Sequence, residues 1–155
     1  MSLLKSPKHP WKEADMRDDH EIVYALIPHE KPLVASETYE EAWKLNEALY
    51  YAKGVDRGLP VDAKGSFMEV ETKSIVVDAL KKAEESNEYV LRVHEERGEQ
   101  VECLIKLDES LGKLSSAKRV NNLEEEVASE EAALSGNAVD ITIPPFKIKS
   151  LKLTF

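Results

Sequence analysis

The residue types that most often carry chemistry do not assemble into a catalytic or metal-binding pattern in this sequence. A glycine-rich phosphate loop, a Cys-x-x-Cys pair, a His-Glu-x-x-His motif and a nucleophile elbow are all missing from it. The four histidines are His9, His20, His29 and His94. They lie far apart and without ligand spacing, which favours solvated or hydrogen-bonding histidines over a zinc site.

The carboxylates are numerous but show no arrangement that specifies a reaction. With 30 acidic residues, adjacent pairs such as Asp18-Asp19 and Glu95-Glu96 are expected by chance. A glycosidase acid-base pair needs two carboxylates a fixed distance apart in a pocket, and this pattern does not specify one. The sequence therefore predicts no catalytic residue and no metal ligand in the chain.

Cys103 is the only cysteine, so the chain cannot form an intramolecular disulfide. It alternates with Val101 and Ile105, as a residue on the buried face of a strand does. We interpret it as a small core residue rather than a nucleophile.

Two surface features have a functional reading beside a plainer one. The stripe Tyr39, Trp43 and Tyr50 could stack on sugar rings or dock onto another domain, although local core is the favoured reading. The charged loop before residue 21 could lie at an active-site rim or between domains, although a solvated loop is favoured. Its candidate residues are Asp15, Arg17, Asp18, Asp19 and His20.

Charge and hydropathy exclude two classes of partner. The net charge of −9 argues against a nucleic-acid binder, which needs a positive surface to displace counterions from phosphates. No apolar stretch approaches the ~20 residues of a membrane span. A length of 155 residues suits one domain, or one domain with an appended piece of another.

The first third of the chain predicts one strand and one helix. Residues 21–28 form an apolar run that suits a central strand covered on both sides. A helix is predicted over residues 38–53, with a capping box of Thr38 and Glu41 and a stop at Gly54. Ala42, Leu45 and the aromatic stripe would give this helix a wide buried face.

A glycine-rich and proline-containing stretch at 54–65 predicts a boundary, which divides the chain into 4–65 and 66–155. The second part is predicted to be an antiparallel β-sandwich of the immunoglobulin-like kind. Its centre is a hairpin over 74–96 with a solvated turn at 81–88. Further strands are expected at 66–71, 100–107, 117–122, 139–143 and 146–155.

Two segments of this second part are less regular. Residues 124–131 are acidic, which favours a short helix or a loop. In the last strand the apolar set changes from Phe146 and Ile148 to Leu151 and Leu153, a shift of one position. Because a one-residue slip turns every side chain to the other face, we predict a β-bulge or bend near Ser150.

The order of several short motifs resembles the C-terminal portion of glycoside hydrolase family 38 α-mannosidases. Each motif is weak alone, but together they follow the family's order over essentially the whole chain. They are SPKHP at 6–10, EAD at 13–15, HEIVYALIPHE at 20–30, KLNEAL at 44–49, SFMEV at 66–70, ALKKAEE at 79–85, VLRVHEERG at 90–98, NNLEE at 121–125 and IPPFKIKSLKL at 143–153.

The resemblance implies a retaining, metal-dependent α-mannosidase in a longer parent protein. In that family the zinc ligands and the nucleophilic aspartate belong to an N-terminal domain, and no motif here matches them. Residues 4–65 would then end a central β-sandwich, and residues 66–155 would be the small terminal one. The start of the chain, Leu3 to Ser6, is typical of a strand whose beginning is missing.

We therefore expect a non-catalytic accessory domain that needs no cofactor itself and whose partners are the catalytic and central domains of the same polypeptide. A divalent metal, zinc, an α-mannoside substrate and a cytoplasmic location are expected of the whole enzyme. The loop before His20 departs from the family pattern by lacking a glycine, so no role is transferred to its residues. A stand-alone carbohydrate-binding module and an oligomerisation domain are the alternatives.

Overall fold

The computed structural model describes residues 20–47 and 65–155. The chain divides into two units, Met1–Tyr51 and Ala52–Phe155, and each is treated by itself. Most of the predicted boundary at 54–65 lies outside the described residues, so it stays a prediction. In the described part, no helix has both the length and the apolar character needed to cross a bilayer.

The N-terminal unit contains a 3₁₀ turn η1 (Leu33–Ala35) and one helix α1 (Thr38–Asn46). Ser36 lies between them and connects them, because its Oγ donates to the Leu33 carbonyl at 2.7 Å and accepts from the Thr38 N–H at 3.3 Å. The N-cap position is Glu37, which makes no capping hydrogen bond through its side chain. The predicted capping box is wrong, since Thr38 already lies inside the first turn.

The helix is also shorter than predicted. It ends at Asn46, and Glu47 has the extended backbone angles φ −103° and ψ 103°. The Asn46 side chain donates from Nδ2 to the Ala42 carbonyl at 2.8 Å, a competing bond that is one reason asparagine is a poor helix former. The prediction of one helix over 38–53 is wrong at residue 47, and residues 48–53 lie outside the described residues, so that part of it is not tested.

The predicted strand over residues 21–28 is not formed. These residues pair with no other strand of the described part, and Val23 and Leu26 are 71% and 82% exposed. The predicted buried face of the helix is wrong as well, because α1 contains no buried residue and Leu45 is 48% exposed. An apolar run forms a buried strand only where it can pair with other strands of a sheet, and residues 20–47 contain no strand for it to pair with.

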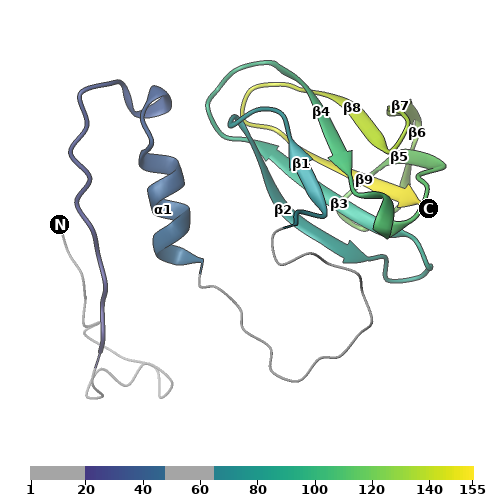
Figure 1. Ribbon diagram of the computed structural model, residues 1–155, viewed down its shortest axis with the longest axis horizontal. Coiled ribbons are helices and arrows are strands. Elements are labelled where there is room, and N and C mark those ends of the chain that lie inside the picture. Colours follow the sequence, from purple (N-terminus) through teal and green to yellow (C-terminus); the bar gives the residue numbers. More distant parts are fainter. Residues whose placement is uncertain (1–19, 48–64) are drawn as a thin grey trace, which may run out of the picture. The chain divides into compact units, whose positions relative to one another are not determined.

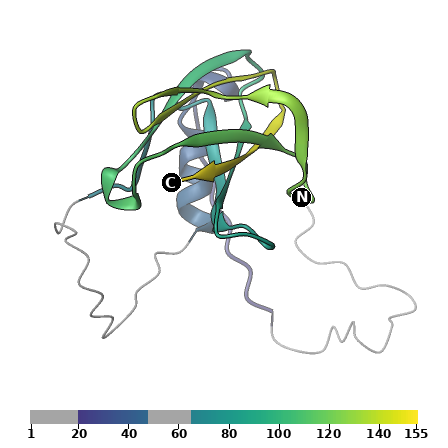
Figure 2. The same cartoon turned by 90° about the vertical axis from the view of Figure 1, so that its right-hand side faces the viewer.

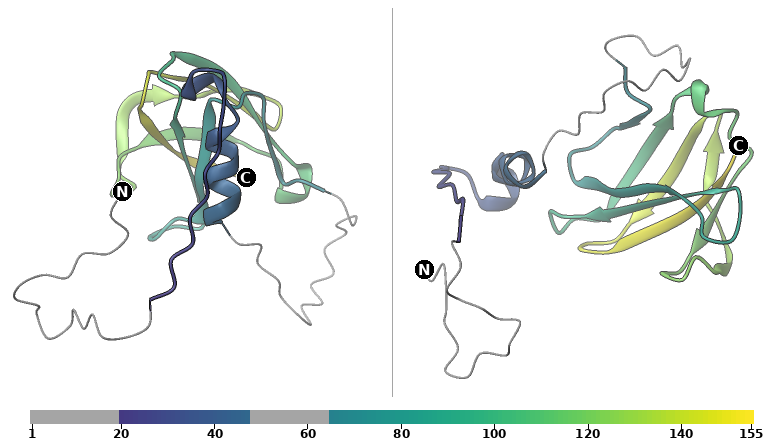
Figure 3. Two further views of the ribbon diagram at one scale, coloured as in Figure 1. Left: turned by 90° about the vertical axis from the view of Figure 1, so that its left-hand side faces the viewer. Right: turned by 90° about the horizontal axis from the view of Figure 1, so that it is seen from below.

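The C-terminal unit is a sandwich of two antiparallel sheets, as predicted (Figure 1). One sheet has the strand order β1-β4-β8-β7 and the other β2-β3-β9-β5-β6; Figures 2 and 3 show both from other directions. A second 3₁₀ turn, η2 (Glu109–Leu111), follows β4. The strands are β1 (Met68–Val70), β2 (Ile75–Lys82), β3 (Tyr89–Glu95), β4 (Val101–Leu107), β5 (Ser116–Val120), β6 (Glu126–Glu131), β7 (Ala133–Ser135), β8 (Ala138–Ile143) and β9 (Ile148–Thr154).

The predicted hairpin is confirmed as β2 and β3. Its register runs from Ile75 opposite Glu95 to Lys82 opposite Tyr89, and shifts once between Val77 and Ala79. That bulge is close to Asp78, whose Oδ1 lies 2.9 Å from His94 Nδ1. The hairpin therefore holds an acid-histidine pair on the face that points away from the core.

The core lies between the two sheets and consists of side chains that alternate along their strands. Leu91 of β3 is opposite Leu151 of β9, and both are almost completely buried. Cys103 is 3% exposed and opposite Ile141, so it is the core residue that the alternation predicted. The buried cluster is Ile75, Leu91, Val93, Cys103, Ile105, Leu107, Leu114, Ala117, Val139, Ile141, Ile143, Leu151 and Leu153.

The last strand corrects the prediction about Ser150. Ser150 is opposite both Arg92 and Val120 in uninterrupted antiparallel pairing, so the predicted bulge is wrong. The two apolar sets need no common face, because Phe146 and Ile148 are 68% and 61% exposed while Leu151 and Leu153 are buried. The apparent phase change marks the point where apolar side chains pass from the surface to the core.

The acidic stretch also differs from the prediction, since β6 occupies Glu126–Glu131 where a helix or loop was expected. Within residues 20–47 and 65–155 it is the last strand of its sheet and pairs with β5 alone. Lys118 of β5 lies 3.2 Å from Glu126 (Nζ to Oε1), and this pairing of charges on neighbouring strands suits an exposed edge.

The burial of Leu91 gives the first testable prediction. Leu91→Ala should lower the free energy of unfolding of the sandwich by about 2–5 kcal/mol, because it leaves a cavity between the sheets. Leu123→Ala, at a side chain that is 77% exposed, should change it by less than about 0.5 kcal/mol. Urea unfolding followed by circular dichroism in the β region would measure both, and equal effects would contradict this account of the core.

Candidate functional site

The site residues predicted from sequence are only partly described by the structure. Asp15, Arg17, Asp18 and Asp19 lie outside the described residues, and His20 is exposed. A role for this loop therefore stays a prediction.

The predicted aromatic stripe is likewise described only in part. Tyr39 is half-buried and Trp43 is 38% exposed on α1, whereas Tyr50 lies outside the described residues. A hollow of about 390 Å³ in the same unit has a different lining: it lies between the 27–31 segment and residues 35–38 and 41. Neither Tyr39 nor Trp43 lines this hollow, and the binding role of the stripe remains a prediction.

The side chains that could ligate a metal are dispersed or already engaged. Nowhere in residues 20–47 and 65–155 do three or more His, Cys, Asp or Glu side chains form a group that could hold a metal ion. His29 Nδ1 lies 2.6 Å from the Lys31 carbonyl oxygen, and His94 Nδ1 is paired with Asp78. Burial raises the pKa of the Cys103 thiol, so a smaller fraction of it is in the reactive thiolate form at neutral pH. The described residues do not fit the zinc expected of the parent enzyme.

A hollow in the described part lies on the outer face of the five-stranded sheet. Its volume is about 710 Å³, and its lining is almost entirely charged or polar. Four segments contribute to it: the end of β2 with the following turn, β3, β9, and the 121–126 stretch that joins β5 to β6. Residues about 60 positions apart thus meet at one place because the sheet order puts β9 between β3 and β5.

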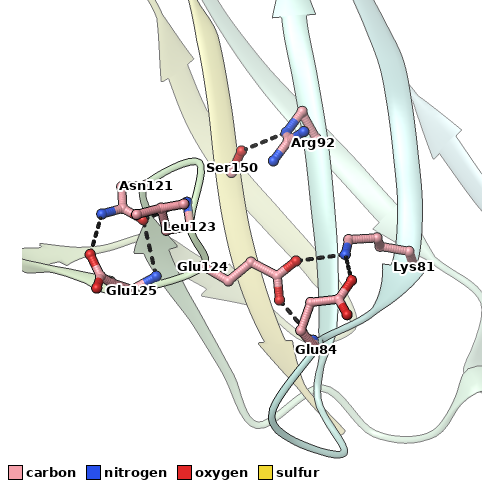
Figure 4. A network of polar contacts seen from close by, with 8 residues as sticks. All are labelled: Lys81, Glu84, Arg92, Asn121, Leu123, Glu124, Glu125 and Ser150. Atoms are coloured by element: carbon pink, nitrogen blue, oxygen red, sulfur yellow. Dashed lines mark hydrogen bonds and ion pairs between the residues drawn. The ribbon is translucent and has the colours of Figure 1, made fainter.

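Glu124 makes the central contact of this hollow (Figure 4). Its Oε1 lies 2.7 Å from Lys81 Nζ, and its Oε2 accepts the Glu84 N–H at 2.9 Å. It therefore reaches from the β5–β6 loop to β2 and the β2–β3 turn, past β3 and β9. We call this contact the Glu124 clasp.

The clasp depends on a specific loop conformation. Glu124 has φ +65°, a left-handed value that is uncommon for a residue other than glycine. Asn121 holds the loop in this shape, because its Oδ1 accepts the N–H of Leu123 at 2.8 Å and of Glu125 at 3.1 Å. Its Nδ2 also donates to Glu125 Oε2 at 2.8 Å.

The electrostatics of the clasp oppose acid-base chemistry. The hydrogen bond from Lys81, followed by that from the Glu84 backbone, lowers the pKa of Glu124. Hydrogen bonds to Glu124 and Glu84 raise the pKa of Lys81. Both groups are therefore held in their charged forms at neutral pH, whereas a general acid needs a carboxyl with a raised pKa.

Arg92 and Lys152 complete the lining of the hollow. Arg92 donates from Nε to Ser150 Oγ at 3.1 Å, which fixes the guanidinium against β9 (Figure 4). Lys152 lies on β9 two residues further along and lowers the pKa of Glu124 through its charge. The hollow thus offers donors and acceptors for a polar contact surface rather than a reactive pair.

A second polar arrangement lies at the opposite end of the sheet around Glu95, which is only 1% exposed. Its carboxylate accepts the N–H groups of Arg97 at 2.7 Å, Gly98 at 2.9 Å and Phe146 at 2.8 Å. Its own N–H donates to the Lys147 carbonyl at 3.0 Å. Glu95 thereby ties the loop after β3 to the loop before β9.

The protonation state of Glu95 follows from these bonds. Burial alone would raise its pKa, but backbone hydrogen bonds from Phe146, Arg97, Glu99 and Gly98 outweigh burial and lower it. The sequence reading assigned the Glu95-Glu96 pair to chance. The available signal was the alternation of β3, which turns Glu95 to the same inner face as Leu91 and Val93.

Comparison with known proteins identifies the sandwich. Residues 74–151 match the family described as the glycosyl hydrolases family 38 C-terminal beta sandwich domain. The chain belongs to this family. The predicted resemblance is confirmed, and the matched range extends from the first residue before β2 into β9.

Two curated relatives of this family 38 chain match nearly its whole length. Alpha-mannosidase 2C1 of Mus musculus is 31% identical over 99% of the chain, and that of Homo sapiens is 30% identical over 99%. Alpha-mannosidase G of Dictyostelium discoideum is 31% identical over 63% of the chain. The chain spans 14% of the length of each 2C1 protein and 9% of the G protein.

The Glu124 clasp gives a prediction that is local. Glu124→Gln should speed hydrogen exchange of the Glu84 amide severalfold, because the charged acceptor for that N–H is replaced by a weaker one. Glu125→Gln is the matched control, since Glu125 bonds to Asn121 and not to Glu84. Exchange measured by nuclear magnetic resonance would resolve the one amide, and unchanged exchange in Glu124→Gln would contradict the clasp.

Glu95 gives a prediction about pH. Its folded-state pKa is lower than the ordinary value of 4.5, so its stabilisation is complete above that value and is lost as pH falls through the folded pKa. Glu95→Gln should lower the free energy of unfolding at pH 7 by about 1–3 kcal/mol, because a carboxamide NH₂ cannot accept these N–H groups. It should also flatten the loss of stability in acid.

The control for this experiment is Glu102→Gln, a change at an exposed position of β4. Urea unfolding at several pH values from 7 down to the acid range would measure all three proteins. If Glu95→Gln kept the wild-type acid dependence, Glu95 would not be its source.

Proposed function

We propose that this chain is the non-catalytic C-terminal β-domain of a retaining, metal-dependent α-mannosidase. The observation that carries the proposal is the family 38 match over 74–151, together with relatives named as α-mannosidases that are far longer than this chain. The state of the clasp supports it, because Lys81 and Glu124 neutralise each other and neither is poised to move a proton.

The partners in this proposal are the catalytic and central domains of the same polypeptide, and the α-mannoside is the substrate of the whole enzyme. The exposed apolar residues near the N-terminus fit this role, since Val23 and Leu26 would gain a cover from the central domain. Zinc would be held by the N-terminal catalytic domain of the full-length enzyme, which lies outside this chain. A cytoplasmic location and an oligomeric state remain predictions.

The proposal predicts that this chain alone does not hydrolyse an aryl α-mannoside, even with zinc supplied. The full-length polypeptide, assayed at the same molar concentration, is the positive control and should turn the substrate over. Robust zinc-dependent hydrolysis by the chain alone would contradict the non-catalytic role. Inactivity of both proteins would contradict the assignment of the parent as an α-mannosidase.

A binding titration separates this proposal from a stand-alone carbohydrate-binding module. The chain should show no specific binding of mannose oligosaccharides in calorimetry. Binding that Trp43→Ala abolishes, with Leu45→Ala on the same helix as the control, would instead favour the module.

A further inference from the structure

The two outer faces of the sandwich differ in what they expose. The outer face of the four-stranded sheet is largely polar along β1, β4 and β8, where the apolar exceptions are the half-buried Leu104 and the buried Ala138. Its exposed residues are Glu69, Glu102, Lys106, Asp140 and Thr142. This face has the composition of a surface that stays in water.

The five-stranded sheet instead ends in an apolar corner at the start of β9. Ile148 is 61% exposed and points the same way as His94, its partner on β3, away from the core. Phe146 precedes it by two residues and is 68% exposed. We call these two side chains the Phe146–Ile148 corner.

The corner is held rigidly although it is exposed. Phe146 has φ +53°, a strained value for an aromatic residue, and the Glu95 carboxylate holds its N–H in that position at 2.8 Å. The ring lies on Gly98, where an added Cβ would come within 2.6 Å of Phe146 Cζ. A buried charge and a glycine thus hold an aromatic side chain whose ring contacts Gly98 on one side and stays 68% exposed.

We propose that the Phe146–Ile148 corner is the anchor by which this sandwich docks onto the rest of its own polypeptide. Interfaces are centred on a few rigid aromatic and aliphatic side chains that enter apolar pockets, with polar groups around them. The partner surface is therefore an apolar pocket on another domain. The His94–Asp78 pair on β3 and β2, on the same outer face, would lie at the rim.

The length of the relatives selects this occupant. The chain matches the 2C1 proteins over 99% of itself but spans 14% of them, so most of such a polypeptide lies outside it. Another domain must contact this exposed corner to cover it, and a longer polypeptide would carry such a domain covalently attached to the sandwich. The inference rests on the proposed function, in that it takes this chain to be a domain of a longer protein.

The test compares the accessibility of one thiol in two contexts. Ile148→Cys is introduced into this chain and into the full-length polypeptide, and its reaction with a maleimide is followed by mass spectrometry. We expect reaction at least about tenfold slower in the full-length protein, because a docked side chain reacts only through transient opening. Glu102→Cys on the four-stranded sheet is the control and should react equally fast in both contexts.

A second variant uses the strain at residue 146. Phe146→Gly should leave this chain as stable as before or make it more stable, because glycine adopts φ +53° without strain. In the full-length protein the same change should restore fast labelling of Ile148→Cys. If Phe146 served only the local fold, Phe146→Gly would not preserve the stability of this chain and at the same time speed the labelling of Ile148→Cys in the full-length protein.

Three outcomes would overturn the proposal. Equal labelling rates of Ile148→Cys in both contexts would show that the corner is not covered. Slow labelling in this chain alone would assign the cover to its own N-terminal unit, and protection that rises with the concentration of this chain would assign it to a second copy. Mannosidase activity of the full-length protein is assayed separately, so docking and the proposed function can fail independently.

Discussion

The sandwich depends on the meeting of two apolar faces, each built from side chains at alternate positions along its strands. Leu91 opposite Leu151 in one sheet and Cys103 opposite Ile141 in the other contribute side chains to a single buried cluster. Because the period of a strand is two, this burial also determines which side chains face outward. The clasp and the apolar corner are formed by loop residues and by strand residues that face away from the core.

The polar groups of this unit are used at the two ends of one sheet in different ways. Glu95 is inside, and it keeps its charge only because backbone N–H groups replace the water that burial removes. Glu124 lies near the surface and is held by an ion pair. The first contact fixes the backbone of two loops, whereas the second joins the β5–β6 loop to the Lys81 side chain and the Glu84 backbone across two intervening strands. Both are consistent with a domain whose polar groups position surfaces rather than reactants.

Much of the β-rich half of the fold could be predicted because most of its strands carry their own alternation, whereas the acidic β6 and the short β7 do not. The hairpin of β2 and β3 and the burial of Cys103 followed from that pattern alone. The prediction at Ser150 failed because alternation locates an apolar face but does not say whether that face is covered. The same limit applies to residues 21–28, whose predicted cover is not supplied by the described residues.

The functional features were less accessible to sequence reasoning. Glu95 joins two loops by accepting hydrogen bonds from three backbone N–H groups. The spacing of side chains in the sequence does not predict such backbone contacts. The Glu124 clasp joins residues 40 positions apart, counted from Glu84, and depends on the order of strands in the sheet. Family resemblance did predict the domain, because the motifs that carry it follow the family's order over essentially the whole chain, including the hairpin and β9.

The acidity of β6 has a further consequence for how the sandwich behaves among other proteins. Among the residues that the structure describes, β6 is the last strand of its sheet, the position at which a strand from another molecule could add. Three of its six residues are glutamates, and charged residues in an edge strand disfavour pairing with a strand from another chain. The acidic composition that made β6 difficult to predict also disfavours edge-to-edge pairing between the sheets of separate molecules.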